Sequence, residues 1–357
     1  MPPGIIEHMS GSLWHGFADM GSVSASGPFV VTRGEGTRVW DRDGNEYLDA
    51  TAGLWFTNIG HGRTEVAQAV ADQLSTLAHY SGFGDLTADV TDALADRLAT
   101  IAPVPGSKIF FTSGGSDSID TAAKLARRYW VEVGKPEKTM IVGRTKAYHG
   151  MHVAGTSLAG IPGNHDGYGT LMPDAQTVEW DDAKSLLGLI ERVGADKVAA
   201  FFCEPIIGAG GIYLPPEGYL AEVRQICRDN DVLFVADEVV TGFGRIGGES
   251  WFASARFDLQ PDMMTTAKGL TSGYVPMGAV FIAPRVAEPF YAGGVWWRHG
   301  YTYGGHAGAA AASMAGASSG SPASMSAASG GSARWAASMA RAVPTDSRCE
   351  IEPPCRR

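Results

Sequence analysis

The sequence lacks a long run of basic residues, and this absence argues against two large classes of function. The formal net charge is −10 over 357 residues. Nucleic acids and anionic membrane surfaces are held mainly by clustered lysines and arginines. We therefore expect no nucleic-acid partner and no electrostatic attraction to a membrane.

Cysteines are few, and long apolar stretches are missing. None of the four cysteines belongs to a C-x-x-C pair, so neither a disulfide framework nor a zinc site is indicated: Cys203, Cys227, Cys349 and Cys355. No apolar stretch approaches the roughly 20 residues that cross a bilayer. Residues 1–27 have neither the basic start nor the apolar core of a secretory signal. These absences predict a cytoplasmic protein.

What the chain does contain is an alternation of strand-like and helical segments between residues 86 and 290. Continuous apolar runs, typical of strands covered on both faces, alternate with segments of helical period. The predicted strands span 108–112, 139–142, 198–203, 232–236, 263–266 and 278–282. The predicted helices span 89–101, 116–133, 183–193 and 216–230. This order predicts an α/β fold with a mostly parallel sheet between layers of helices.

The segments before this alternation are shorter. Residues 1–28 predict an extended arm with short helical or irregular pieces. Apolar runs separated by Gly and Asn turns predict an antiparallel meander over 29–49, and a helical period predicts a helix over 64–77. The end of the chain has a different composition from the preceding segments. Residues 307–340 are almost entirely Ala, Ser, Gly and Met without a repeating apolar face, so we expect a disordered tail over 307–357.

Two of the predicted strands end in a single charged residue. Asp237 follows the apolar run 232–236, and Lys268 follows 263–266. Ligands of such sheets bind beyond the carboxyl ends of the strands. An acid that holds a pyridinium nitrogen and a lysine that binds a carbonyl carbon are the two groups that a pyridoxal-phosphate enzyme requires. The pair therefore indicates this class of chemistry.

Other polar groups lie at the same edge of the predicted sheet. Gly115 and Ser116 follow a strand and open a helix, where backbone N–H groups and a hydroxyl can bind phosphate, although a plain Ser cap after a glycine turn has the same sequence. Tyr148 could stack on a flat ring or lie buried under a loop. Glu204 is either solvated at the sheet edge or faces a pocket. His149 and His152 are close in sequence, but no third ligand follows at metal spacing, so a zinc site is not expected.

Together these stretches resemble the class III (omega) aminotransferases of the fold-type I pyridoxal-phosphate superfamily. The resemblance covers about residues 10–306 and is most similar to the omega-amino acid:pyruvate branch. It is carried by residues 52–55, 60–63, 111–116, 148–150, 237–245, 266–269 and 302–306. The implied cofactor is pyridoxal 5′-phosphate, and the implied assembly is a homodimer with shared active sites.

The resemblance implies a role for each catalytic and ring-binding residue. Lys268 would bind the cofactor covalently and then move the substrate proton. Asp237 would keep the pyridine nitrogen protonated. Tyr148 would stack on one face of the ring and line the substrate pocket, and Val239 would pack on the other face.

The same resemblance implies further contacts with the cofactor and substrate. Gly115 and Ser116 would bind the phosphate, and Thr302 would reach the phosphate of the neighbouring subunit. Glu204 would lie near the O3′ side of the ring. Trp55 would line the substrate pocket.

The implied domains are unequal. Residues 1–53 would form the arm and the first part of a small domain, and 54–306 would form the large cofactor-binding domain. The tail over 307–357 stands in place of the rest of the small domain, where the family has its carboxylate-binding arginine. No candidate for that role is found among Arg334, Arg341 and Arg348. We therefore expect a truncated or frame-shifted reading of a longer gene.

The expected function is transfer of an amino group from an omega-amino acid or primary amine to a keto acid such as pyruvate. An aminomutase or a decarboxylating relative on the same scaffold stays open, because fold and cofactor do not separate these reactions. A product inactivated by the altered tail is a third interpretation.

Overall fold

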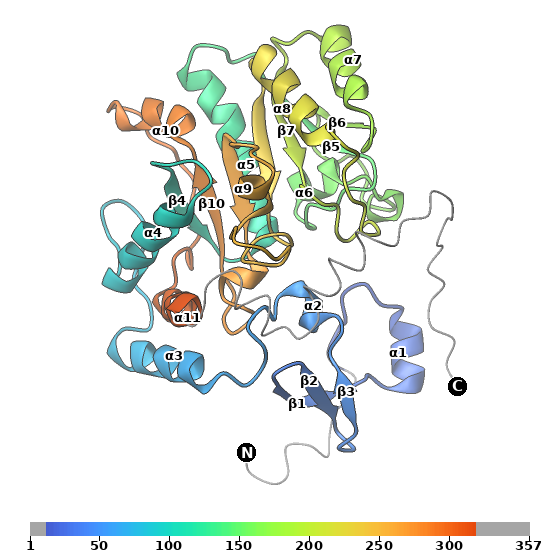
Figure 1. The fold of residues 1–357 in the computed structure, drawn as a ribbon, viewed down its shortest axis with the longest axis vertical. Helices are drawn as coiled ribbons and strands as arrows, with labels where there is room; N and C mark the ends of the chain where they lie inside the picture. The colour runs from blue at the N-terminus through green and yellow to red at the C-terminus, as the bar shows by residue number, and fades with distance from the viewer. Residues whose placement is uncertain (1–11, 319–357) are drawn as a thin grey trace.

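A seven-stranded sheet forms the centre of the computed structural model, which describes residues 12–318 (Figure 1). The strand order is β4-β10-β9-β8-β7-β5-β6. The strands are β4 (Lys108–Thr112), β5 (Met140–Arg144), β6 (Ala175–Val178), β7 (Val198–Cys203), β8 (Leu233–Asp237), β9 (Met263–Thr266) and β10 (Gly278–Ile282). Within this sheet β10 is antiparallel to both β4 and β9, while the other pairings are parallel. The prediction of a mostly parallel, mixed sheet is confirmed.

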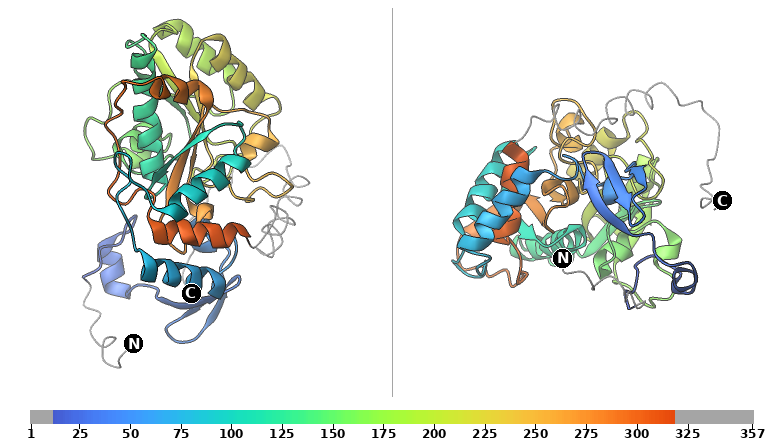
Figure 2. Two further views of the ribbon diagram at one scale, coloured as in Figure 1. Left: turned by 90° about the vertical axis from the view of Figure 1, so that its left-hand side faces the viewer. Right: turned by 90° about the horizontal axis from the view of Figure 1, so that it is seen from below.

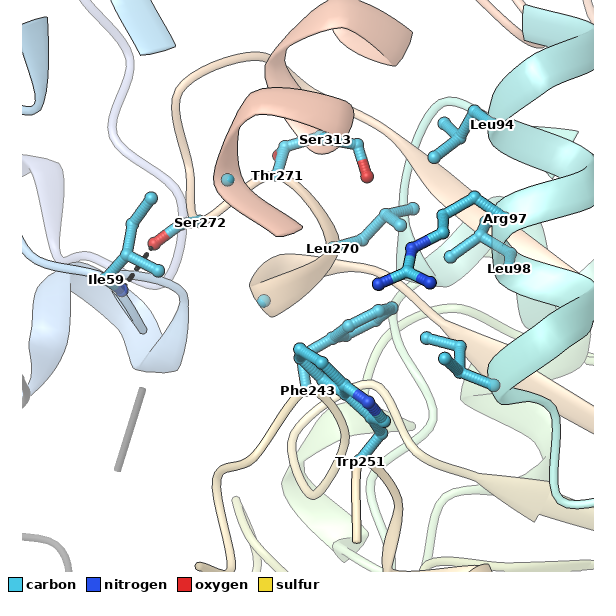
Figure 3. Close-up of a pocket in the computed structure, with 13 residues that line it drawn as sticks. Ile59, Leu94, Arg97, Leu98, Phe243, Trp251, Leu270, Thr271, Ser272 and Ser313 are labelled. Atoms are coloured by element: carbon cyan, nitrogen blue, oxygen red, sulfur yellow. Dashed lines mark hydrogen bonds between the residues drawn. The ribbon is translucent and has the colours of Figure 1, made fainter. Parts of the chain in front are cut away.

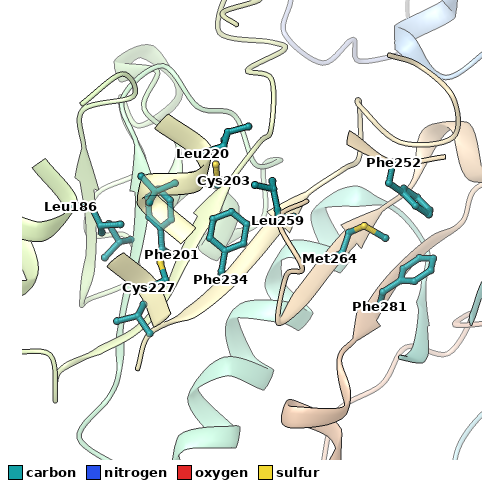
Figure 4. Packing of buried hydrophobic residues seen from close by; sticks show 14 of the residues in the cluster. Leu186, Phe201, Cys203, Leu220, Cys227, Phe234, Phe252, Leu259, Met264 and Phe281 are labelled. Carbon is teal, nitrogen blue, oxygen red and sulfur yellow. The ribbon is translucent and has the colours of Figure 1, made fainter. Parts of the chain in front are cut away.

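Helices cover both faces of the sheet, because the central strands are apolar on both sides. On one face, Phe201 of β7 and Phe234 of β8 pack with α4 (Asp89–Ile101), α7 (Ala183–Val193) and α8 (Tyr219–Asp229) (Figure 4). On the other face, the alternate strand residues pack against three more helices: α5 (Gly115–Glu132), α6 (Val153–Leu158) and α10 (Pro284–Tyr291). Burial of both faces leaves the strand ends as the place where polar side chains can gather.

The N-terminal part lies below the sheet in Figure 1. After α1 (Met20–Ser26), the predicted meander is present as β1 (Val31–Glu35), β2 (Arg38–Asp41) and β3 (Glu46–Leu48), which are antiparallel neighbours. It is followed by the short helix α2 (Ala52–Trp55) and by α3 (Thr64–Thr76). A bridge between Gly36 and His61 ties the meander to the segment that leads into α3.

The expectation of a disordered tail from residue 307 is wrong for its first part. Residues Ala307–Ser318 form a 12-residue helix, α11, which packs against α3 and α4 (Figure 2). Its small side chains are buried in every direction up to residue 313. A helix enclosed on all sides needs no amphipathic period, and the search for a repeating apolar face therefore missed it. The remainder of the expected tail, 319–357, lies outside the described residues.

Several short elements were also missed. They are α9 (Ala253–Arg256), the 3₁₀ turns η1 (Pro162–Asn164) and η2 (Lys268–Leu270), helices α2, α6 and α10, and strand β6. Most of them have too few residues to show a helical period. The helix predicted over 216–230 begins later, at Tyr219, after Gly218 with φ of 75°. Among residues 12–318, no helix has both the length and the apolar character needed to cross a membrane.

Candidate active site

Asp237 is the last residue of β8 and is almost completely buried. Its Oδ2 lies 2.7 Å from Nδ1 of His149. Its Oδ1 accepts hydrogen bonds from the backbone N–H of Val239 (3.1 Å) and the hydroxyl of Thr265 (3.2 Å). Three donors therefore fix the orientation of one carboxylate at the carboxyl end of the sheet.

His149, for which the sequence predicted no role, is the closest side-chain partner of Asp237. It is buried, and its ring packs edge-on against Phe202 at 6.2 Å. Because a carboxylate only accepts hydrogen bonds, the proton lies on Nδ1. Within the described part of the chain, Nε2 has no hydrogen-bond partner. The one available signal was its position beside Tyr148, just after a strand end.

Lys268 follows β9 and begins the turn η2, with a left-handed backbone (φ 44°). Burial lowers the pKa of its ammonium group, and the charge of Arg245 acts in the same direction. The charges of Asp237 and Glu204 act in the opposite direction, which places both acids within electrostatic reach of the lysine. A lowered pKa favours the neutral amine, which is the nucleophilic form of lysine.

Glu204 is buried at the end of β7, which settles the choice between a solvated edge and an enclosed position. Its Oε1 accepts a hydrogen bond from the backbone N–H of Tyr148 (3.0 Å), and its Oε2 accepts one from Gly208 (2.9 Å). Burial raises the pKa of this carboxyl. Tyr148 itself is half-buried, and its pKa is raised by burial and by the charge of Asp237. Glu204 thus anchors the loop that carries the aromatic ring.

The start of α5 forms a cradle of backbone groups between two loops. A β-carbon at Gly115 would lie 3.0 Å from Cγ1 of Val239, so the close approach of these loops favours glycine. The hydroxyl of Ser116 accepts a hydrogen bond from the N–H of Met151 (3.2 Å). The first turn of a helix offers N–H groups that have no partner inside the helix, together with the positive end of the helix dipole. This arrangement can hold a phosphate group.

Trp55 contacts Arg245, whose charge acts on Lys268. It is half-buried, and its carbonyl accepts a hydrogen bond from Nη2 of Arg245 (3.1 Å). Like Lys268, Trp55 and Phe243 have left-handed backbones, with φ of 57° and 55°. Such conformations are unfavourable outside glycine and cluster at functional sites.

The structure does not bring Thr302 to this group of residues. Thr302 is exposed, and its carbonyl accepts a hydrogen bond from Nε2 of His79 (2.8 Å). None of the contacts found within residues 12–318 joins it to Lys268 or Asp237. Its expected role toward a neighbouring subunit stays a prediction.

A separate, mostly apolar pocket lies behind the turn η2 (Figure 3). Leu94 and Leu98 of α4 and Ser313 of α11 contribute to its wall, and the side chain of Arg97 extends toward it. None of the residues predicted for the active site lines this pocket. It is therefore distinct from the Lys268 site.

Comparison with known proteins agrees with this geometry. Residues 21–317 match the family described as aminotransferase class-III. The putrescine–pyruvate aminotransferase of Pseudomonas aeruginosa is 40% identical over 316 residues, which cover 84% of this chain and 68% of the relative. The beta-alanine–pyruvate aminotransferase of the same organism is 39% identical over 312 residues, with 81% and 68% covered.

Solved structures show the same fold. An (S)-enantioselective omega-transaminase from Thermomicrobium roseum has a TM-score of 0.82 and 38% identity, covering 85% of this chain and 71% of its own. An amine transaminase from an uncultivated Pseudomonas species, solved with bound pyridoxal phosphate, has a TM-score of 0.81 and 34% identity, with 85% and 73% covered. The expected fold type is confirmed.

The residues present also fit the cofactor of these structures. The glycine cradle at Gly115 accommodates a phosphate, the buried Asp237 suits a protonated ring nitrogen, and Lys268 offers an amine of lowered pKa. The chain belongs to the class III aminotransferases, which depend on pyridoxal phosphate.

Proposed function

We propose that this protein transfers an amino group from an omega-amino acid or a primary amine to a keto acid such as pyruvate. The observation that carries the proposal is the placement of Lys268 within electrostatic reach of the buried Asp237. The names of the relatives support the substrate class, because they include beta-alanine, putrescine and pyruvate.

Lys268 and Asp237 have different roles in the proposed reaction. When bound, pyridoxal phosphate supplies an electron sink for the negative charge that develops on the substrate carbon. Lys268 holds the cofactor and then carries the proton to and from that carbon, since a lysine of lowered pKa can act as both base and acid near neutral pH. Asp237 holds the proton on the ring nitrogen, and the N–H of His149 fixes the carboxylate for that task.

The surrounding residues hold the cofactor in place. The N–H groups at the start of α5 and the hydroxyl of Ser116 bind the phosphate. Tyr148 and Val239 cover the two faces of the ring, and Glu204 fixes the backbone of Tyr148 and lies toward the O3′ side. Their arrangement around Asp237 supports these assignments.

The assembly proposed with this function is a cytoplasmic homodimer. Large apolar side chains are exposed, including those of Trp14, Phe17 and Trp296, and such surface is typical of protein–protein contacts. In the dimer Thr302 would bind the phosphate of the neighbouring subunit, while Trp55 would line the substrate pocket. Two free cysteines, Cys203 and Cys227, support a reducing compartment.

An absorbance experiment tests the proposal. The full chain is loaded with pyridoxal phosphate, mixed with beta-alanine or a primary amine, and then supplied with pyruvate. We expect the amine to convert the cofactor from its aldehyde form to its amine form, and pyruvate to reverse the change with release of alanine. Bound cofactor that no amine converts would contradict the proposal. Release of carbon dioxide would favour the decarboxylating relative, and a rearranged amine formed without pyruvate would favour the aminomutase.

A further inference from the structure

Arg245 lies close to Lys268 and has no acidic partner. Its Nη2 donates hydrogen bonds to two neutral oxygens, the carbonyl of Trp55 and the side-chain oxygen of Asn58. Its Nε has no partner, and no hydrogen bond from Nη1 is formed within residues 12–318. In that same part of the chain, no Asp or Glu forms an ion pair with this guanidinium. Most of the hydrogen-bonding capacity of a five-donor group therefore stays unused.

Three other arginines of the chain, buried or partly buried, differ from Arg245. Arg224 and Arg285 both form ion pairs with Asp262, at 3.3 and 3.2 Å. Arg144 has no such pair, but it is fully buried and donates to the carbonyl of Glu204, so no ligand can reach it. Arg245 is only partly enclosed. Arg245 is therefore accessible in part and has a positive charge without an acidic partner among residues 12–318.

The position of Arg245 connects it directly with the reacting lysine. A β-carbon at Gly269, the residue after Lys268, would lie 2.5 Å from Nδ2 of Asn58 and 3.0 Å from Cβ of Phe243. Asn58 therefore contacts the turn η2 while it also accepts a hydrogen bond from Arg245. The same two segments carry the strained backbones of Trp55 and Phe243. The guanidinium and the amine belong to one compact group of residues.

A cation in such a place needs an anion from outside. Removing a charge from water without a partner is unfavourable by several kcal/mol, and a buried guanidinium is usually paired with a carboxylate or phosphate. The phosphate of the cofactor already has a cradle at the start of α5. The remaining anion of the reaction is the carboxylate of the substrate, to which the free Nη1 of the guanidinium can donate a charged hydrogen bond.

We propose that Arg245 forms a carboxylate subsite beside Lys268. The inference rests on the proposed function and narrows it: short aliphatic carboxylates, as omega-amino acid in one half-reaction and as keto acid in the other, are favoured over substrates of the same length without a carboxylate. This subsite lies in the part of the chain before residue 319, so it does not require the arginine that the family has further on.

The test compares matched substrates in single half-reactions. Beta-alanine is paired with propylamine, and pyruvate with acetone, so that a methyl group replaces the carboxylate in each pair, for the wild type, Arg245→Gln and Arg245→Lys. We expect the preference for the carboxylate, as a ratio of kcat/KM values, to fall about 10- to 100-fold in Arg245→Gln, the usual effect of losing a charged hydrogen bond. In Arg245→Lys it should fall by about threefold or more, because the charge stays but an ammonium group cannot keep the bonds of the guanidinium to Trp55 and Asn58 while it donates to the carboxylate.

The control variant is Arg97→Gln, and Arg245→Lys serves as a second test variant. Arg97→Gln removes an arginine that lines the separate pocket of Figure 3, and it should leave the preference unchanged. An equal fall for both members of each substrate pair in Arg245→Gln would assign Arg245 a purely structural role and overturn the proposal. If the Gln variant does not fold, the Lys variant decides, and an undiminished preference in it overturns the proposal.

A binding measurement separates this inference from the proposed function. Calorimetry with propanoate and the cofactor-free chain should show binding that Arg245→Gln weakens about 10- to 100-fold. If the wild type performs no amino transfer but binds propanoate through Arg245, the proposed function fails and the subsite stands. If propanoate binds the wild type and Arg245→Gln equally, or binds neither, the subsite is refuted even where amino transfer is observed.

Discussion

Nδ1 of His149 donates a hydrogen bond to Oδ2 of Asp237 over 2.7 Å, and both side chains are buried. The two residues are 88 positions apart in the chain and come from neighbouring regions of the sheet edge. The bond fixes the tautomer of the imidazole, so the N–H faces the acid and the free lone pair of Nε2 faces away from it. One acid is thereby held in a single orientation for the cofactor.

Replacing His149 with Leu should remove this support while keeping a similar volume. A hydrogen bond to a charged group is worth about 1.5–3 kcal/mol, so we expect kcat to fall about 10- to 100-fold. Asn places a donor near the position of Nδ1, and His149→Asn should recover a large part of the loss. Steady-state kinetics and the affinity for pyridoxal phosphate measure both effects. Equal activity of the Leu variant and the wild type would show that Asp237 needs no support from His149.

Lys268→Ala should abolish turnover, because it removes the amine that lies within electrostatic reach of Asp237. Borohydride reduction followed by mass spectrometry should locate the cofactor on the peptide that contains Lys268 in the wild type and nowhere in the variant. Lys197→Ala is the matched control, since Lys197 lies in an exposed ion pair with Glu137. Turnover by the Lys268 variant at the wild-type rate would refute the assignment.

Gly115→Ala should weaken cofactor binding by about tenfold. The added methyl group would lie 3.0 and 3.3 Å from the two γ-carbons of Val239, which must then move away from the ring site. Gly188 in α7 has no neighbour within 4 Å of an added β-carbon. Gly188→Ala should therefore leave the affinity unchanged and stabilise the helix by about 0.5–1 kcal/mol. Titration with pyridoxal phosphate and thermal unfolding measure the two variants, and tight binding by Gly115→Ala would contradict the cradle.

His299 should make the protein less stable as the pH falls. Lys124 donates to its Nδ1 (2.9 Å), so Nε2 carries the proton and donates to Thr121 (2.8 Å). Burial and the charge of Lys124 lower the pKa of His299 from 6.5 to about 4. Between these values the unfolded chain binds more protons than the folded chain, so the free energy of unfolding rises with pH across this window and is lost on acidification.

His299→Gln should remove this part of the pH dependence. We expect the loss of stability between pH 6.5 and 4 to shrink by about 1–2 kcal/mol, a value reduced for the half-exposed position of the ring. Urea unfolding at several pH values gives the measurement. An unchanged slope in the variant would mean that other groups account for the acid sensitivity.

The sequence predicted those parts of the site that depend on local patterns. Asp237 and Lys268 each follow a continuous apolar run, and a parallel sheet brings such strand ends together without further information. The role of His149 depends on a contact with a distant residue, so no local pattern contains it. Arg245 lies within a recognised motif, but its missing counter-charge is visible only after folding. Glu204 was predicted at a strand end, while its burial required the three-dimensional structure.

The contact between α3 and α11 has a consequence for the order in which the chain assembles. Val66 of α3 and Ala312 of α11 belong to one buried cluster, although nearly the whole sheet domain separates them in the sequence. A ribosome that adds about 5–20 residues per second needs roughly 10–50 s to travel from one to the other. During that interval α3 has left the ribosome while the helix that covers its apolar side does not yet exist. The nascent chain therefore exposes this surface until synthesis has passed α11.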